Sequence, residues 1–297
     1  MVVLVTGASG QLGQSLQFLA KSQFNINIKS QKENDLEFIF CNSTELDITD
    51  SNNVQNIFDK YKPNFCINTA AYTAVDKAES EPEKAYLINV VGAKNLAATC
   101  NQYNATLLHI STDFVFDGSK KSPYAEIDLP NPAGVYGQTK LEGEKAVQEI
   151  CAKHYIIRTS WVYSQFGNNF LKTMLRLASE KDSLSVVNDQ IGTPTNAVDL
   201  AAVLIKIIQN SIQYPTKNNY GIYNFSNEGY CSWYDFAKKI FEFNNSKINL
   251  QPIATFGYPT PAKRPVYSVL DKSKIKNTFN LQIKTWQESL ITVILPI

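Results

Sequence analysis

Tyr136 and Lys140 are four residues apart in the segment Tyr-Gly-Gln-Thr-Lys. Side chains at this spacing lie on one face of a helix, so a phenol and an ammonium would be neighbours there. In a reductase, a tyrosine can donate a proton to a nascent alkoxide, and a nearby ammonium lowers the pKa of that tyrosine. The spacing alone is weak support for this chemistry, because Tyr234 and Lys238 repeat it in the same chain.

The residues around each pair separate the two candidates. Thr112 ends a strongly apolar run upstream of Tyr136. In α/β proteins, ligands bind outside the carboxyl ends of the strands, so a hydroxyl at this position can hydrogen-bond a substrate oxygen. Tyr234 instead lies in the aromatic stretch 233–236, which is typical of a hydrophobic core or an interface between lobes. We therefore predict Thr112, Tyr136 and Lys140 as catalytic residues, and Tyr234 as structural.

A glycine-rich loop lies between the first apolar run and the first helical pattern. Gly7, Gly10 and Gly13 give the spacing G-x-x-G-x-x-G. In dinucleotide sites the first glycine permits a tight turn, the second lets the backbone approach a pyrophosphate, and the third lets the helix pack closely on the strand. The helix N-terminus adds partial positive charge. Such loops also occur as plain connections, but the position between a strand and a helix favours dinucleotide binding.

The end of the second predicted strand should meet the adenosine ribose. NAD-selective sites usually carry a carboxylate there. Here the position is Asn42, and no acid follows until Glu45. Without a carboxylate at this position, the 2′-phosphate of NADPH is not repelled. Without an arginine, the 2′-phosphate has no strong binding partner. We therefore expect NADPH as the cofactor, with NADH also compatible.

Alternating apolar runs and amphipathic stretches must position these residues. The sequence predicts strands over 2–5, 38–41, 65–68, 106–110 and 155–159, and helices over 51–61, 83–102 and 138–153. Continuous apolar strands that alternate with helices indicate a parallel sheet covered on both faces. We expect an α/β protein with a Rossmann-type doubly wound parallel sheet in a dinucleotide-binding domain, residues 1–160. Residues 161–297 should form a smaller, mixed α/β substrate lobe, with some later elements returning to the first domain.

Composition excludes several classes of protein. The chain has 297 residues, 28 basic and 27 acidic side chains, and a net charge of +1, so it has no global field that would attract nucleic acid or anionic lipid. A folded chain of this length buries roughly three quarters of its surface. Hydrophobic residues make up 44% of the sequence, which argues against disorder. The five cysteines are scattered and the two histidines are isolated, so we expect free thiols and no metal site. The apolar N-terminal run is too short for a signal peptide or a membrane span, and we expect a cytoplasmic protein.

Four of these motifs together resemble those of the extended short-chain dehydrogenase/reductases. They are T-G-x-x-G-x-x-G at 6–13, Asn-Thr-Ala-Ala at 68–71, Ser-Thr-Asp at 111–113, and the Tyr136–Lys140 pair. Within that superfamily, the chain is similar to the enzymes that reduce dTDP-4-dehydrorhamnose. This closer similarity rests on the stretches 70–79, 111–116, 158–163, 167–170, 188–195 and 258–265.

The resemblance implies NAD(P)H-dependent reduction of the C4 ketone of dTDP-4-dehydro-L-rhamnose to dTDP-L-rhamnose. Tyr136 would donate the proton, Lys140 would bind the nicotinamide ribose and tune Tyr136, and Thr112 would hold the C4 oxygen. Asp113 and Trp161 would contact the sugar, and Arg264 is a candidate for the diphosphate, because a fork of donors suits phosphate oxygens. With the glycine loop and the strand end, the cofactor-binding residues would be Gly7, Ser9, Gly10, Gln11, Leu12, Gly13, Asn42, Asp47, Ile48, Ala70, Ala71, Tyr72, Tyr136 and Lys140.

Two positions depart from related enzymes. Sugar-nucleotide 4,6-dehydratases carry a glutamate after the Thr-Asp pair, and Phe114 stands there in this chain, which argues against water elimination. Some family members bind Mg²⁺ at a dimer interface through glutamates, and Ser15 replaces one of them. We therefore expect no metal, and a monomer or a weak homodimer. Two alternatives stay open: a non-catalytic NADP-binding regulatory subunit like that of methionine adenosyltransferase, and a reductase of another dTDP-4-keto-6-deoxyhexose.

Overall fold

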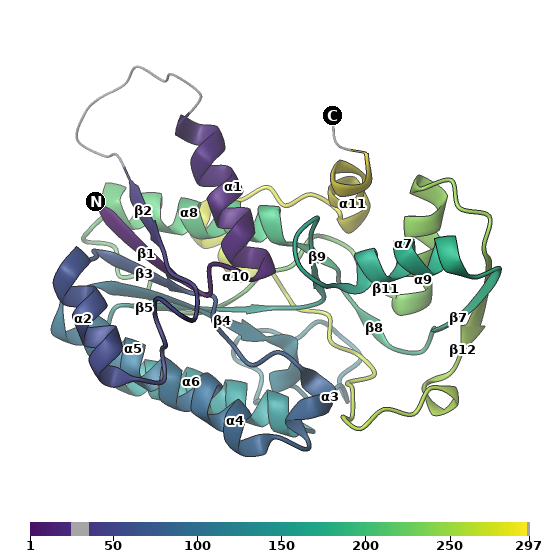
Figure 1. Ribbon diagram of the computed structural model, residues 1–297, viewed down its shortest axis with the longest axis horizontal. Helices are drawn as coiled ribbons and strands as arrows, with labels where there is room; N and C mark the ends of the chain where they lie inside the picture. Colours follow the sequence, from purple (N-terminus) through teal and green to yellow (C-terminus); the bar gives the residue numbers. More distant parts are fainter. Residues whose placement is uncertain (25–35, 296–297) are drawn as a thin grey trace.

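A six-stranded parallel sheet forms the centre of the protein. The computed structural model describes residues 1–24 and 36–295, and Figure 1 shows the sheet between two layers of helices. The strand order is β10-β5-β4-β3-β1-β2. The strands are β1 (Val2–Thr6), β2 (Glu37–Phe40), β3 (Phe65–Asn68), β4 (Thr106–Thr112), β5 (His154–Thr159) and β10 (Gly221–Asn224). The expected doubly wound parallel sheet is confirmed, and strand addition reverses direction between β1 and β3, where such sheets bind ligands.

Each face of the sheet is covered by its own helices. Side chains alternate along a strand, so Val3 and Val5 of β1 face one layer and Leu4 faces the other. On the Val3 face lie α1 (Gln11–Phe24), α8 (Ala197–Gln213) and α10 (Ser273–Phe279). On the Leu4 face lie α2 (Ser51–Tyr61), α5 (Gly92–Gln102) and α6 (Val135–Ile150). The continuous apolar strands are therefore explained by burial on both faces.

Local signals set several element ends. The helix predicted over 51–61 is α2, and its N-terminus is capped by the Asp50 side chain, which accepts from the backbone N–H groups of Asn52 and Asn53. The helix predicted over 138–153 starts three residues earlier, at Val135, and ends at Ile150. This shift places Tyr136 in the first turn of the helix rather than before it.

The helix predicted over 83–102 is interrupted. It consists of α4 (Pro82–Tyr86), the π-helical turn η1 (Leu87–Val91) and α5. The Asn89 side chain in this turn accepts from the backbone N–H of Tyr72 and donates to the Tyr72 carbonyl. The π turn therefore holds the loop that follows β3, which is one of the predicted cofactor segments.

A second, smaller lobe is built from short elements around its own core. It contains α7 (Phe170–Glu180), α9 (Trp233–Phe243), α11 (Trp286–Ile294), and the parallel pair β7 (Ser183–Val187) and β12 (Asn249–Ile253). Two-residue strands complete it: β6 (Val162–Tyr163), β8 (Ile191–Gly192), β9 (Thr195–Asn196) and β11 (Cys231–Ser232). Short connecting helices are α3 (Val75–Ala78), η2 (Asp113–Val115) and η3 (Thr255–Gly257). Figure 1 shows this lobe beside the carboxyl ends of the main strands.

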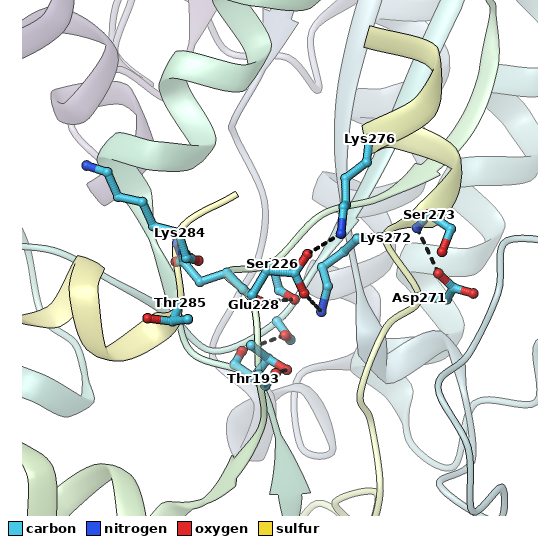
Figure 2. A network of polar contacts seen from close by, with 12 residues as sticks. Thr193, Ser226, Glu228, Asp271, Lys272, Ser273, Lys276, Lys284 and Thr285 are labelled. Carbon is cyan, nitrogen blue, oxygen red and sulfur yellow. Dashed lines mark hydrogen bonds and ion pairs between the residues drawn. The ribbon is translucent and has the colours of Figure 1, made fainter. Parts of the chain in front are cut away.

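Three elements that follow residue 160 in the sequence form part of the main sheet or pack against it. Strand β10 is its edge, and α8 and α10 cover one face. A charged network joins α10 to the segment after β10: Glu228 accepts from Lys276 at 2.7 Å and lies 3.7 Å from Lys272 (Figure 2). The chain therefore passes between the lobes more than once. The division into residues 1–160 and 161–297 stays a proposal about function.

Within residues 1–24 and 36–295, no helix has both the length and the apolar character needed to cross a membrane.

Candidate active site

Thr112 and Tyr136 meet at the carboxyl edge of the sheet. Thr112 ends β4, and Tyr136 lies in the first turn of α6. Burial raises the pKa of Tyr136 to about 12, with a smaller contribution from the charge of Asp113 and against the lowering effect of a hydrogen bond with the Thr112 side chain. Tyr136 is therefore protonated at neutral pH and can act as a proton donor.

Phe114 forms one wall around the Tyr136 ring. The two rings pack edge to face, with centroids 5.5 Å apart and planes inclined by 71°. At Gly137 a Cβ would lie 2.2 Å from the Phe114 carbonyl oxygen, so only glycine lets α6 approach this closely. Phe114 stands at the position that carries an acid in the dehydratases, so an apolar ring lies beside the Tyr136 ring in this protein.

Lys140 lies one turn along α6 from Tyr136 and is buried. Its Nζ donates to the carbonyl oxygen of Ile110 at 2.7 Å and lies 3.5 Å from Nε2 of His109. Burial lowers the pKa of Lys140 to about 8, and the carboxylate of Glu144 partly opposes that shift. The groups that shift the pKa of Tyr136 do not include Lys140, so a tuning role for Lys140 stays a prediction.

Asp113 is a buried acid next to Thr112. It is 2% exposed, and burial raises its pKa to about 6 against the lowering effect of the Ser268 and Thr112 hydroxyls. Its Oδ1 accepts from Thr112 at 3.1 Å. Its Oδ2 has no hydrogen-bond partner among the residues that the structure describes. A buried acceptor of this kind is costly unless a ligand supplies a donor, and a sugar hydroxyl can do so.

The glycine loop has two structural glycines and one open one. Gly7 has φ +66°, and a Cβ there would lie 2.7 Å from the Ala70 backbone nitrogen. At Gly13 a Cβ would lie 2.6 Å from the Gly7 carbonyl oxygen. Gly10 is exposed with Ser9 at the N-terminus of α1, and a Cβ there would meet only the Gly7 oxygen, at 3.3 Å. This open N-terminus fits a pyrophosphate approaching backbone N–H groups.

The other predicted cofactor residues follow the carboxyl ends of β2 and β3. The Asn42 side chain accepts from the backbone N–H of Thr44 at 2.8 Å, and the Asp47 carboxylate accepts from that of Thr49 at 2.9 Å. Leu12 and Ile48 are buried in the hydrophobic layers, so only their backbone atoms remain for a cofactor. The fourteen predicted cofactor residues therefore lie towards the carboxyl edge of the sheet. They are Gly7, Ser9, Gly10, Gln11, Leu12, Gly13, Asn42, Asp47, Ile48, Ala70, Ala71, Tyr72, Tyr136 and Lys140.

The Gln11 side chain forms hydrogen bonds with residues of the second lobe. Its Oε1 accepts from the Asn169 side chain at 2.9 Å and from the Ser164 hydroxyl at 3.1 Å, and its Nε2 donates to the Val162 carbonyl at 3.4 Å. Sequence reasoning did not anticipate this bridge. The stretch 167–170, which contains Asn169, was recognised in the sequence. Its position beside the glycine loop could not be predicted from the sequence.

Trp161 lies where the chain enters the second lobe. Its backbone is left-handed, with φ +46°, and its indole stacks on that of Trp233. At Gly192 a Cβ would lie 2.6 Å from the Trp161 ring, so this glycine provides the space for the indole. Tyr234, beside Trp233, packs against the core of the second lobe, which confirms its structural interpretation.

Arg264 reaches a cavity of about 440 Å³ in the second lobe, and its terminal nitrogens are already paired. They bind both carboxylate oxygens of Asp76, at 2.9 and 2.7 Å, and one also donates to Thr260 at 2.6 Å. The cavity is lined in part by Phe170, Met174, Trp233, Tyr258, Thr260 and Arg264. The sequence did not reveal the Asp76 partner, and the contact of Arg264 with a diphosphate stays a prediction.

No group of three or more His, Cys, Asp or Glu side chains that could hold a metal ion occurs in the part of the chain that the structure describes. Ser15 is buried in α1 and donates to the Gln11 carbonyl at 2.8 Å.

A glycine loop at a parallel sheet edge, with a Tyr–Lys helix beside the next strands, is the arrangement of the short-chain dehydrogenase/reductases, and this protein is of that class. The family model described as RmlD substrate binding domain matches residues 1–296, and the chain belongs to this family.

Relatives and solved structures agree with that assignment. The chain is 45% identical over 294 residues to the dTDP-4-dehydrorhamnose reductase of Aggregatibacter actinomycetemcomitans, with 97% of this chain and 96% of that protein covered. The crystal structure of a dTDP-4-dehydrorhamnose reductase from Clostridium acetobutylicum aligns with a TM-score of 0.90, 44% identity, and coverage of 99% and 98%. The enzyme from Bacillus anthracis, solved in complex with NADP, also gives 0.90, with 39% identity and coverage of 100% and 99%.

Proposed function

We propose that this protein is an NADPH-dependent oxidoreductase that reduces the C4 ketone of dTDP-4-dehydro-L-rhamnose to dTDP-L-rhamnose. The observation that carries the proposal is the meeting of the Thr112 and Tyr136 hydroxyls at the edge that also carries the glycine loop. The relatives named dTDP-4-dehydrorhamnose reductase support the choice of substrate, because they match almost the whole chain.

The nicotinamide, when bound, supplies the hydride that reduces C4. Tyr136 donates its proton to the developing C4 oxyanion, and its raised pKa keeps that proton in place until then. Thr112 holds the same oxygen by a hydrogen bond. Lys140, as an ammonium, binds the ribose hydroxyls and offsets the negative charge left on Tyr136. The three side chains therefore stabilise charge that develops only in the transition state.

Asp113 and Trp161 orient the sugar. The unpaired Oδ2 of Asp113 accepts from a sugar hydroxyl, which removes the cost of its burial. The Trp161 indole presents an apolar face to the sugar ring, and its stack on Trp233 limits its movement. Orientation of this kind places C4 near both the hydride and the tyrosine.

The nucleotide part of the substrate occupies the cavity beside Arg264. Phe170, Trp233 and Tyr258 line it and suit a planar base, because aromatic rings stack on bases. The Arg264 fork suits diphosphate oxygens, and its pairing with Asp76 must then weaken or be shared. Residues 1–160 would thus bind the dinucleotide and residues 161–297 the sugar nucleotide, with α8, α10 and β10 serving the first lobe.

We propose NADPH as the preferred cofactor. Asn42, at the end of β2, brings no negative charge to the place where the adenosine ribose is expected, so a 2′-phosphate is not repelled. The Bacillus anthracis relative was solved with NADP.

We further propose a monomer or weak homodimer without a bridging metal. The position at which some family members have a metal-binding glutamate is Ser15, whose hydroxyl is used within α1. Size-exclusion chromatography with and without Mg²⁺ should give the same elution volume.

The test is NADPH oxidation, followed by absorbance, with authentic dTDP-4-dehydro-L-rhamnose and with NADH in a parallel series. Absorbance loss with NADPH supports the reductase. NADPH binding without turnover would instead indicate a non-catalytic regulatory subunit, and faster turnover of another dTDP-4-keto-6-deoxyhexose would reassign the substrate.

A further inference from the structure

A buried chain of polar side chains joins the glycine-loop strand to the catalytic lysine. The Thr6 hydroxyl donates to Oδ1 of Asn68 at 2.7 Å, and Nδ2 of Asn68 lies 3.1 Å from Nδ1 of His109. Nε2 of His109 lies 3.5 Å from Nζ of Lys140. The chain thus crosses the adjacent strands β1, β3 and β4 and ends on α6. His109 is 1% exposed, so water does not replace these contacts.

The backbone around Asn68 determines which ring nitrogen of His109 carries the proton. The Ala70 backbone N–H can only donate, and it donates to Oδ1 of Asn68 at 3.1 Å. The other amide atom, Nδ2, therefore faces His109 as a donor and requires a lone pair on Nδ1. His109 is consequently neutral, with its proton on Nε2. Its burial, which lowers its pKa well below the usual range, acts in the same direction.

The Nε2–H group then points at Lys140. An ammonium has no lone pair, so a charged Lys140 faces this donor without a hydrogen bond between them. A neutral amine can accept the N–H. The His109 ring therefore favours the uncharged form of Lys140, in addition to the effect of burial.

Other ionisable groups around Lys140 are already engaged. Glu144, one turn further along α6, favours the ammonium, but it is held in an ion pair by Arg158 of β5. Asp113, which follows β4, acts on Tyr136. His154, at the start of β5, acts on His109 and lowers its pKa. His109 is thus the neighbour whose proton faces Lys140 directly.

We propose that His109 is a positioning residue that directs its Nε2–H at Lys140 and so sets the pH at which Lys140 loses its charge. This inference rests on the proposed function, in which Lys140 acts as an ammonium. The contact also gives the direction of the change. Removal of the Nε2–H removes a donor that opposes the ammonium of Lys140, so the ammonium persists to higher pH.

The first experiment measures the pH dependence of kcat/KM. In the unchanged protein, kcat/KM should fall as pH rises through the pKa of Lys140. His109→Phe should move this alkaline limb upward by about one pH unit, a tenfold change in the ionisation constant. His109→Gln, which can keep an N–H near the Nε2 position, should restore the original limb. His154→Gln is the matched control, because His154 is the only other histidine, and it should leave the limb in place. An unmoved limb in folded His109→Phe protein would overturn the proposal.

A second variant changes the proton on His109 without removing the ring. In Asn68→Asp the carboxylate still accepts from Thr6 and Ala70, but it now requires a proton on Nδ1 of His109. Nε2 then becomes an acceptor for the Lys140 ammonium, and the alkaline limb should again move upward. A limb that stays or moves downward contradicts the inference.

A third measurement does not depend on activity and so separates this proposal from the proposed function. Nitrogen-15 NMR of protein labelled at its two histidines reports the tautomer and titration of each ring, with His154→Gln providing the assignment. His109 should stay neutral, with the proton on Nε2, at pH values well below the usual histidine pKa of about 6.5. A proton on Nδ1, or an ordinary titration, would refute the proposed contact even in an active enzyme.

Discussion

The indole rings of Trp161 and Trp233 stack with centroids 3.5 Å apart and planes inclined by 11°. The Trp161 backbone is left-handed, a conformation that costs on the order of 1–3 kcal/mol for a residue other than glycine. The stack and the space at Gly192 offset this cost and fix the indole at the entrance to the second lobe. Because Trp233 also lines the 440 Å³ cavity, one aromatic pair connects the proposed sugar and nucleotide subsites.

Trp233→Phe should raise the KM for the sugar nucleotide about five- to tenfold with little change in kcat. The smaller ring weakens the stack by about 1 kcal/mol, whereas the proton donor is untouched. Steady-state kinetics measure the effect, and circular dichroism follows the exciton signal of the paired indoles, which should disappear. Trp286→Phe, in the core of the second lobe, should keep that signal. An unchanged KM after loss of the signal would separate Trp161 from sugar binding.

Tyr136→Phe should lower kcat about 10²- to 10⁴-fold, the usual contribution of a positioned general acid. NADPH binding, measured by fluorescence titration, should survive because only a hydroxyl is lost. Tyr234→Phe is the matched control, since Tyr234 has the same spacing to a lysine but packs in the second lobe. Near-normal turnover in Tyr136→Phe would remove its assigned role.

Glu144→Gln should destabilise the fold by about 3–5 kcal/mol, because it leaves the buried Arg158 guanidinium without its counter-charge. The two side chains form three hydrogen bonds of 2.6–3.2 Å between α6 and β5. Urea unfolding measures the loss. Glu180→Gln breaks the exposed ion pair with Arg176 and should change the free energy of unfolding by less than about 1 kcal/mol. Equal effects from the two variants would contradict this assignment of burial.

Arg264→Gln should raise the KM for the sugar nucleotide about tenfold and leave kcat nearly unchanged, if the guanidinium holds the diphosphate. Asp76→Asn distinguishes that role from a purely structural one. Release from Asp76 leaves the Arg264 fork free for phosphate, so KM should stay the same or fall. A rise in KM of similar size in both variants would mean that the ion pair serves only to hold the loop 258–265.

Asp113→Asn should stabilise the protein near pH 7 while it lowers activity. The folded-state pKa of Asp113 is raised to about 6, above its value of about 3.9 in an unfolded chain. A carboxyl with a raised pKa contributes stability below the unfolded value, and that contribution is lost as pH rises from about 4 through 6. The variant should therefore gain stability in unfolding experiments at pH 7 relative to pH 4. A gain that does not depend on pH would contradict the shift.

Features that depend on local chemistry could be predicted from the sequence. Apolar runs between helical patterns predicted five strands of the parallel sheet, and the helix predicted over 51–61 is α2. The Tyr136–Lys140 pair could be predicted because its members share one helix face, and Gly7 and Gly13 because a turn between strand and helix leaves no room for a Cβ. Such signals act within a few residues, so their spacing is visible in the sequence.

Contacts between side chains that are distant in the sequence depend on how the whole chain packs. The Asp76–Arg264 ion pair, the Trp161–Trp233 stack and the contact of His109 with Lys140 each join different elements. So does the return of β10 to the edge of the main sheet. No periodicity encodes these contacts, because they depend on how whole layers pack and on which polar groups burial forces to find partners. The sequence therefore predicted the reacting groups, whereas the packing set their burial and their neighbours and, through both, their pKa values.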